Sequence, residues 1–225
     1  MTNRHMTVSQ KEWWIYMNWD NKEEVLKRVK KNGELLEFVS DRLKDDKEIV
    51  LTAIKNYENA LKWTSNNLKN DFDVVMTAVK KNGNTLQWAS QILRDNKEFM
   101  LEMCKIHGWA LQFASNRLKD NKEFILKTIH LSKSNLLYIS EKLKDDPEIV
   151  LKAVKYQDDA LYFVKDKFTK DKEIITEAVK NTFTSLQWAS YDLKNDKEFM
   201  LKMAKIDKRA LNFATNKVKN SVQSL

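Results

Sequence analysis

The sequence contains few of the residues that interrupt helices. Among its 225 residues there are only 3 glycines and 1 proline. Loop-rich and all-β proteins need more of both, because glycine supplies turn conformations and proline ends helices. The composition therefore predicts a helical protein.

Long apolar runs are also missing, so we expect no membrane-spanning segment. The first residues, MTNRHMTVSQKEWW, lack an apolar stretch followed by a small-residue cleavage site, so we expect no secretory signal. The lone Cys104 cannot form an intrachain disulfide, which fits a reducing compartment. These absences favour a cytoplasmic location, although delivery into a host cell by another route stays open.

Sequence motifs that carry chemistry are absent as well. The three histidines, His5, His107 and His130, fall in the N-terminal tail, in a loop and at a helix end, and no HExxH or paired Cys/His spacing occurs. Two glycine-rich phosphate-binding motifs, GxxxxGK[ST] and GxGxxG, are also absent from the sequence. We therefore predict no catalytic residue, no metal and no cofactor. The net charge of +8, from 40 basic and 32 acidic residues, permits an acidic partner.

What the sequence does contain is a repeat with a period of 25 residues. One leucine in each repeat keeps this period without a break, at Leu36, Leu61, Leu86, Leu111, Leu136, Leu161, Leu186 and Leu211. An aromatic residue follows two positions later, at Phe38, Trp63, Trp88, Phe113, Tyr138, Phe163, Trp188 and Phe213. The period predicts a tandem array of eight repeats, at residues 20–44, 45–69, 70–94, 95–119, 120–144, 145–169, 170–194 and 195–219.

Each repeat is predicted to form two helices of about ten residues. Asn or Asp stands at the second position of every repeat, as expected for an N-cap, and Pro147 follows such a residue at the first helical position. Gly33, Gly83 and Gly108 share one position after the first helix, where a left-handed residue commonly ends a helix. The aromatic row is predicted to lie in the core, and Cys104 to be a small buried hydrophobic residue.

Helices of this length are not stable alone, so the repeats must stack to form a continuous core. We expect an all-α, right-handed solenoid forming a single repeat domain over residues 20–219. Residues 1–19 would form a tail and capping helix, in which Ser9 and Glu12 have capping-box spacing and Trp13 aligns with the aromatic row. Residues 220–225 would form a C-terminal tail. Repeats 95–119 and 195–219 match at 14 of 25 positions, which suggests duplication of a four-repeat block.

The pattern DKE(I/F)(V/M)L…ALQ(W/F)AS…LK resembles the tandem helical repeats of the family called domain of unknown function 4116. The resemblance covers residues 20–219, with local departures at Asn135, where other repeats have a small residue, and at Lys165, where they have serine. That family carries no established chemistry. The resemblance therefore implies the helical repeat fold and leaves the function open.

Charged residues also recur with the repeat. Acidic residues stand at the start of each first helix, and a lysine stands near its end at Lys30, Lys55, Lys80, Lys105, Lys155, Lys180 and Lys205. This arrangement is the one that the helix dipole favours. The alternative interpretation is a basic track for nucleic acid, formed by Lys55, Lys80, Lys105, Lys155, Lys180 and Lys205. The recurring serines, such as Ser40 and Ser115, are predicted to pack or to bond to the preceding turn.

Aromatic residues that interrupt the polar positions of the repeat are the candidate binding residues. Exposed aromatic side chains are favoured anchors at interfaces, whereas the alternative is local burial by the loops. Most of these residues fall between the two predicted helices, and one stands where other repeats have polar residues. The candidates are Tyr57, His107, Trp109, Tyr156, Tyr162 and Phe183.

These observations favour a non-catalytic scaffold that binds another macromolecule, as an adaptor, an effector or an inhibitor that works by occlusion. The predicted partner is a protein, and a monomer is favoured over an oligomer. Binding of RNA, DNA or a ribonucleoprotein through the lysine rows is the main alternative. An enzyme with a cleft between the two four-repeat halves is a third, weaker hypothesis.

Overall fold

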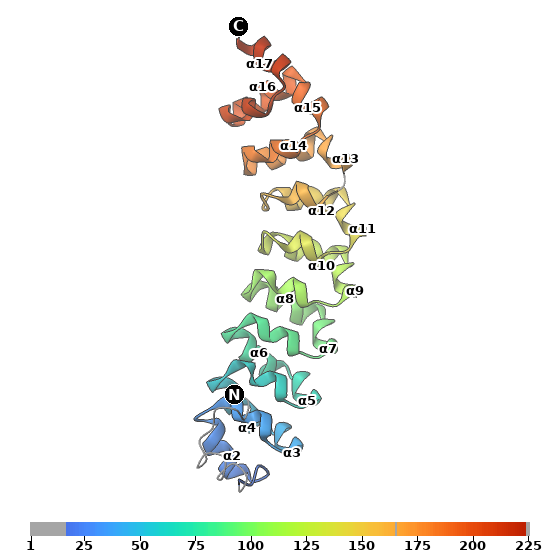
Figure 1. Ribbon diagram of the computed structural model, residues 1–225. Coiled ribbons are helices and arrows are strands. Elements are labelled where there is room, and N and C mark those ends of the chain that lie inside the picture. The colour runs from blue at the N-terminus through green and yellow to red at the C-terminus, as the bar shows by residue number, and fades with distance from the viewer. Residues whose placement is uncertain (1–16, 165, 224–225) are drawn as a thin grey trace. The chain divides into compact units, whose positions relative to one another are not determined.

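The computed structural model describes residues 17–164 and 166–223 (Figure 1). Every regular element within these ranges is a helix, and none of these helices is long and apolar enough to cross a lipid bilayer. The chain divides into two compact units between Leu93 and Arg94. The predicted capping box of Ser9 and Glu12, together with Trp13, lies outside the described residues.

In the first unit, the same three elements follow one another in each repeat: a long α-helix, a 3₁₀ helix and a short α-helix. The long helices are α2 (Lys22–Val29), α4 (Lys47–Asn56) and α6 (Phe72–Lys81). The 3₁₀ helices are η1 (Gly33–Phe38), η2 (Glu58–Trp63) and η3 (Gly83–Trp88). The short helices are α3 (Asp41–Lys44), α5 (Asn66–Lys69) and α7 (Gln91–Arg94), and the last of these reaches the division between the units.

The second unit continues this order. Its long helices are α8 (Lys97–Ile106), α10 (Lys122–Thr128), α12 (Pro147–Val154), α14 (Lys172–Asn181) and α16 (Lys197–Ile206). Its 3₁₀ helices are η4 (Gly108–Phe113), η5 (Ile129–Leu131), η6 (Asn135–Tyr138), η7 (Ala160–Phe163), η8 (Phe183–Trp188) and η9 (Lys208–Phe213). The remaining helices are α9 (Asn116–Lys119), α11 (Glu141–Lys144), α13 (Asp166–Thr169), α15 (Tyr191–Asn195) and α17 (Asn216–Gln223). Within this unit the long helices stack and the short ones follow one side (Figure 1).

The prediction of a second helix of about ten residues is wrong. In the first repeat, extended backbone at Val39 and Ser40 separates η1 from α3. The Ser40 hydroxyl accepts a hydrogen bond from the Leu43 amide at 3.4 Å, so it caps a new helix. Serine is a strong N-cap residue, and its recurrence breaks the second segment of most repeats in the same way.

The predicted start of the first helix is confirmed. The Asp46 carboxylate accepts hydrogen bonds from the amides of Glu48 and Ile49, at 3.0 and 3.2 Å, and caps α4. Pro147 occupies the first turn of α12, directly after the cap Asp146. At that place the missing N–H costs no hydrogen bond.

The left-handed role predicted for the glycines is wrong, because no glycine in the described part of the chain has a positive φ. Gly33 instead begins η1 and lies against the next repeat. A Cβ atom added there would collide with the Ala53 carbonyl oxygen and lie 2.8 Å from the Tyr57 Cβ. Gly33 is therefore explained by the close approach of two repeats.

The core is built from the apolar stripe of each long helix and the leucine of each 3₁₀ helix. In α4, Ile49, Val50, Ala53 and Ile54 are all fully buried. The leucine row is buried from Leu36 through Leu186, whereas Leu211 is partly exposed. Cys104 is fully buried within this core, as predicted.

Candidate binding surfaces

The aromatic row lies at the surface, so its predicted place in the core is wrong. Phe38 is 39% exposed and Trp88 is 37% exposed, and the other members of the row are partly exposed. The row was predicted as core because it keeps step with the leucine. In a 3₁₀ helix, which turns once in three residues, side chains two positions apart lie on different faces. The leucine therefore points into the core while the aromatic ring reaches the edge.

Among the described residues, a cluster of exposed aromatic side chains lies on η6, η7 and η8, which contact one another in that order. Tyr162 is 62% exposed, and its ring centroid lies 4.9 Å from that of Phe163 and 5.1 Å from that of Trp188. Leu137, at the place that Tyr162 occupies in the next repeat, is 43% exposed. We call Leu137, Tyr138, Tyr162, Phe163 and Trp188 the aromatic surface. Of these five residues, the sequence singled out only Tyr162.

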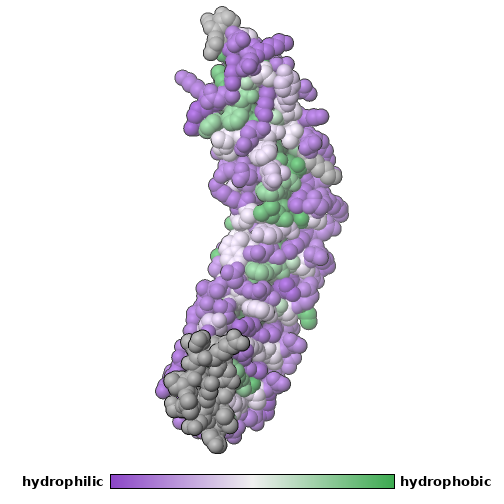
Figure 2. Space-filling view, viewed as in Figure 1, coloured by the Kyte–Doolittle hydropathy of each residue, from purple (hydrophilic) through white to green (hydrophobic). Residues whose placement is uncertain are grey.

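On the face shown in Figure 2, hydrophobic patches lie among hydrophilic side chains. Contiguous apolar surface is uncommon on monomeric proteins and marks sites of interaction. A cluster of neighbouring exposed apolar residues therefore carries more information than the same residues exposed singly.

Three other candidates lie at the start of 3₁₀ helices. The His107 and Trp109 rings lie 5.3 Å apart, and Trp109 also contacts Phe113 at 6.1 Å. Tyr57 packs against Trp63 at 6.0 Å. Tyr57, His107 and Trp109 are each partly buried, so local packing accounts for part of their surface.

The remaining two candidates differ in exposure. Tyr156 is 49% exposed and its ring lies 5.6 Å from that of His130. Phe183 is partly buried, because the Arg209 guanidinium lies 4.0 Å from its centroid and Phe213 lies at 6.1 Å. Phe183 is therefore covered in part by the following repeat, and Tyr156 is the more accessible of the two.

The lysine row at the ends of the long helices is exposed throughout. Lys180 and Lys155 share Glu177, at 2.5 and 3.9 Å. Among the described residues, no ion pair forms at the other members of the predicted basic track, Lys55, Lys80, Lys105 and Lys205. Their charges are directed at solvent.

The lysines that close the repeats have a structural role instead. Lys119 donates to the Gln112 carbonyl at 2.6 Å, and Lys194 donates to the Gln187 carbonyl at 2.8 Å. Burial lowers the pKa of both ammonium groups, and for Lys119 the nearby Arg94 adds to this effect. These lysines cap carbonyls at the ends of 3₁₀ helices and are not free for a partner.

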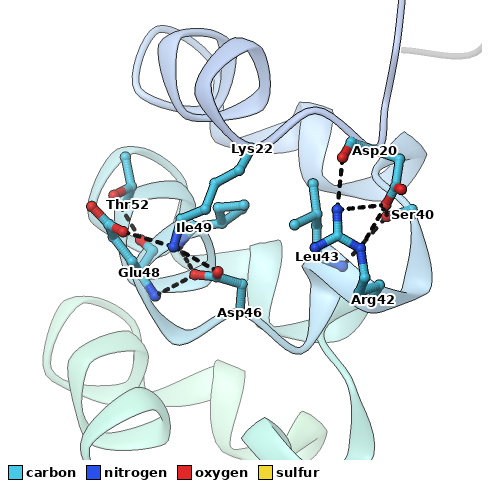
Figure 3. A network of polar contacts seen from close by, with 9 residues as sticks. All are labelled: Asp20, Lys22, Ser40, Arg42, Leu43, Asp46, Glu48, Ile49 and Thr52. Atoms are coloured by element: carbon cyan, nitrogen blue, oxygen red, sulfur yellow. Dashed lines mark hydrogen bonds and ion pairs between the residues drawn. The ribbon is translucent and has the colours of Figure 1, made fainter.

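A second set of lysines joins neighbouring repeats, and the sequence interpretation missed it. Lys22 binds Asp46 at 2.8 Å and Glu48 at 3.0 Å, so it links α2 to the first turn of α4 (Figure 3). Lys122 binds Asp146 and Glu148 in the same way, both at 2.8 Å. The acidic residues do lie in first turns, as the dipole interpretation predicted, but they also hold the preceding repeat.

The recurring serines close several of the repeats. The Ser40 hydroxyl donates to Asp20 Oδ1 at 2.5 Å, and Arg42 Nε donates to the same oxygen at 3.1 Å (Figure 3). These two hydrogen bonds lower the pKa of Asp20. The hydroxyl thus donates to a carboxylate and accepts from a helix amide, so it both closes the repeat and caps α3.

No group of three potential metal ligands occurs in the described ranges. Cys104, the one thiol, is fully buried, and burial raises its pKa to about 12. A thiol with such a pKa is a poor nucleophile at neutral pH. The candidate groups that the structure exposes are the aromatic surface and the lysines at the ends of the long helices.

The sequence comparisons agree with the repeated elements. No curated protein and no solved structure matches the chain. A family model for a domain of unknown function matches six overlapping segments, at residues 21–68, 46–94, 96–144, 121–169, 146–193 and 171–219. Four of the five steps between their first residues equal one 25-residue period, and the matches cover most of the chain. The chain therefore belongs to the family described as Domain of unknown function (DUF4116).

Proposed function

We propose that the protein is a non-catalytic scaffold that binds another protein through the aromatic surface. The observation that carries this proposal is the 62% exposure of Tyr162 beside Trp188, Phe163 and Leu137. Tyrosine and tryptophan are the residues that most often anchor protein interfaces, because they bury a large area at low entropic cost. An adaptor, an effector and an inhibitor by occlusion would all use such a surface.

The surface is carried by a stiff framework, which supports the proposal. Short 3₁₀ helices are weak on their own. Here Lys194 binds the carbonyl of Gln187 within η8 at 2.8 Å, and the Ser190 amide bonds to the Thr169 carbonyl at 2.9 Å. A preorganised surface loses less entropy on binding.

The partly buried candidates Tyr57 and His107 occupy a position at which other repeats have a side chain that caps the 3₁₀ helix. Asn32 and Asn82 cap η1 and η3 through their side chains, at 3.0 Å each. Tyr57 and His107, at the same position of their repeats, make no side-chain cap. Replacing a good cap costs local stability. We therefore keep Tyr57, and separately His107 with Trp109 beside it, as candidate binding residues.

Affinity capture from the native host tests the proposal, with wild type compared against Tyr162→Ala. Tyr191→Ala is the matched control, because Tyr191 is 71% exposed on the short helix α15. A protein retained by wild type and by Tyr191→Ala but lost with Tyr162→Ala, with nuclease present, is the expected result. Equal retention by all three proteins would contradict the proposal.

Binding of nucleic acid is the second candidate, and the exposed lysine row favours it. Lys55, Lys80 and Lys105 have no carboxylate partner among the described residues, which leaves them available to phosphates. For this candidate, affinity for RNA or DNA must fall steeply with salt and with Lys80→Glu and Lys105→Glu. Lys217→Glu, on an exposed residue outside the row, is the control. Binding that is indifferent to salt would exclude the lysine row as a track.

The proposal extends to the architecture. Eight repeats forming a right-handed solenoid, capped by residues 1–19 and monomeric in the cytoplasm, would present the aromatic surface on one continuous body. The 25-residue recurrence of elements and of family matches supports the array. An experimental structure tests the repeat number and the handedness, and light scattering tests the monomer. A dimer that buries Tyr162 would contradict this arrangement.

A further inference from the structure

A groove with a volume of 1190 Å³ lies along α16 and η9. Leu201, Ala204 and Leu211 supply apolar lining. Its other lining residues are mostly charged, and they include Lys202, Lys205 and Lys208. None of these residues belongs to the aromatic surface, so the groove is a separate site.

The equivalent grooves of other repeats show what fits such a site. Helix α4 packs against both α2 and η1, and α6 packs against both α4 and η2. In those repeats Val29 and Ile54, at the place of Ala204, are fully buried. Ala204 and Leu211 are partly exposed. The groove of the repeat at 195–219 is therefore shaped like the grooves in which the long helices of other repeats pack. We call such a groove a seat.

The apolar character of the occupant follows from the helices that fill the other seats. Each of them presents a stripe of the kind formed by Ile49, Val50, Ala53 and Ile54, at spacings of one and four residues. Ala204 replaces a larger Val or Ile at its position, which leaves extra room. A helix with a bulky aliphatic stripe would bury Leu211 and Ala204 as the internal helices bury their counterparts.

The positive charges at the rim of the groove favour a negatively charged occupant. At an internal seat, Lys155, which directly follows α12, meets Glu177 of α14 at 3.9 Å. Lys202, Lys205 and Lys208 have no ion-pair partner within the described part of the chain, and the only acidic residue lining the groove is Glu198. Carboxylates on an incoming helix would complete these pairs and exclude basic helices.

We propose that this groove binds an acidic amphipathic α-helix of a partner protein, seated as one more long helix on the repeat at 195–219. A second copy of this chain is a poor occupant. Its first long helix and the two residues after it, residues 22–31, hold five basic and two acidic residues. A basic helix would meet a basic rim, and like charges facing each other oppose docking.

A labelled peptide tests this inference. The probe copies residues 171–182, DKEIITEAVKNT, with glutamate at both lysines and a hydrocarbon staple that keeps the short peptide helical. The counterpart carries lysine at each acidic position. Fluorescence anisotropy with the full chain should show saturable binding of the acidic peptide and at least about tenfold weaker binding of the basic one, a difference of about 1.4 kcal/mol.

Three variants locate the binding. Leu211→Glu and Lys205→Glu should each weaken the acidic peptide by about tenfold or more, because one places charge on the apolar lining and the other reverses the rim. Lys105→Glu, at the corresponding place of α8, is the matched control and should change nothing. Lys205 is exposed, so its variant keeps the test decisive even if Leu211→Glu fails to fold.

Three results would overturn the inference. The first is equal affinity for the two peptides, and the second is acidic-peptide binding that survives both groove variants. The third is concentration-dependent self-association that Leu211→Glu abolishes, because the occupant would then be a second copy. Tyr162→Ala must leave peptide binding unchanged, so a failure here is distinguishable from a failure of the aromatic surface.

Discussion

Ser140 and Asp120 stand near opposite ends of one repeat, and the Ser140 hydroxyl donates a hydrogen bond to Asp120 Oδ1 at 2.5 Å. The same hydroxyl accepts from the Leu143 amide at 3.3 Å, so one oxygen closes the repeat and begins α11. Ser90 and Asn70 form the corresponding pair at 2.6 Å. A side-chain hydrogen bond that joins the two ends of a repeat thus recurs along the chain.

Removal of this hydroxyl should destabilise the protein measurably. Ser140→Ala loses both the cap and the closing bond, and we expect it to lower the free energy of unfolding by about 1 kcal/mol. Ser140→Thr should be nearly neutral, because Thr215 makes the same closure with Asn195 at 2.8 Å. Urea denaturation followed by circular dichroism measures both. Equal losses for the two variants would show that the hydroxyl is not responsible.

Gly33→Ala should destabilise through steric overlap. Its Cβ would press on the Ala53 carbonyl and on Tyr57, and overpacking of this kind costs about 1–3 kcal/mol. Lys208→Ala, at the same position of its repeat, removes only an exposed side chain and should change stability little. Thermal melting compares the two. A neutral Gly33→Ala would mean that the repeats can move apart at no cost.

The pair of Lys122 and Asp146 predicts a pH dependence. Burial raises the pKa of the Asp146 carboxyl, but hydrogen bonds from Lys122 and from the amides of Ile149 and Glu148 lower it by more, so the net pKa lies below its ordinary value. A lowered folded pKa means that the pair stabilises the protein at neutral pH. This contribution is lost below about pH 4, as the pH falls toward the folded pKa.

Two substitutions at Asp146 separate the ion pair from the helix cap. Asp146→Asn keeps a capping oxygen, as Asn121 does in its own repeat. It should lower the free energy of unfolding by up to about 1 kcal/mol at neutral pH, and the free energy of unfolding should then depend less on acid pH. Asp146→Ala also loses the cap and should cost about 1 kcal/mol more. Denaturation at pH 7 and at pH 3 measures these differences. If the loss of stability between pH 7 and pH 3 is unchanged in Asp146→Asn, other carboxylates are responsible for that loss.

Cys104 should be unreactive in the folded protein. Its side chain is fully buried and its pKa is raised to about 12, so the thiolate fraction and the access of reagents are both low at pH 8. Modification by a disulfide reagent should be slow and should accelerate as urea unfolds the protein. Rapid stoichiometric labelling under native conditions would show that the core opens at this helix.

Features set by local chemistry could be predicted from the sequence. The N-caps, Pro147 at the first helical position and the buried stripe of each long helix depend on residue type and spacing within a few positions. The break at Val39 and Ser40 was missed because serine is tolerated within helices and its capping role depends on the backbone around it. The role of Gly33 depends on Ala53 and Tyr57, which belong to another repeat.

The aromatic surface was predicted only in part. Tyr162 departs from the polar residues at its position, so the sequence alone marked it. Trp188 and Phe163 follow the repeat, and that regularity is equally compatible with a buried row and with an exposed one. Residues two positions apart lie on different faces of an α-helix, about 200° apart, and of a 3₁₀ helix, about 240° apart. The period that the rings share with the leucine therefore gave no ground for placing them in the core.

Site-specific photo-crosslinking tests the central claim, binding of a protein through the aromatic surface, most directly. A photoreactive phenylalanine derivative replaces Tyr162, which is 62% exposed, or Tyr191, which is 71% exposed, and each protein is irradiated in host extract treated with nuclease. We predict a discrete crosslinked protein from position 162 that is absent from position 191 and is competed by unlabelled wild type but not by Tyr162→Ala. The same products from both positions, or none at position 162, would contradict the account.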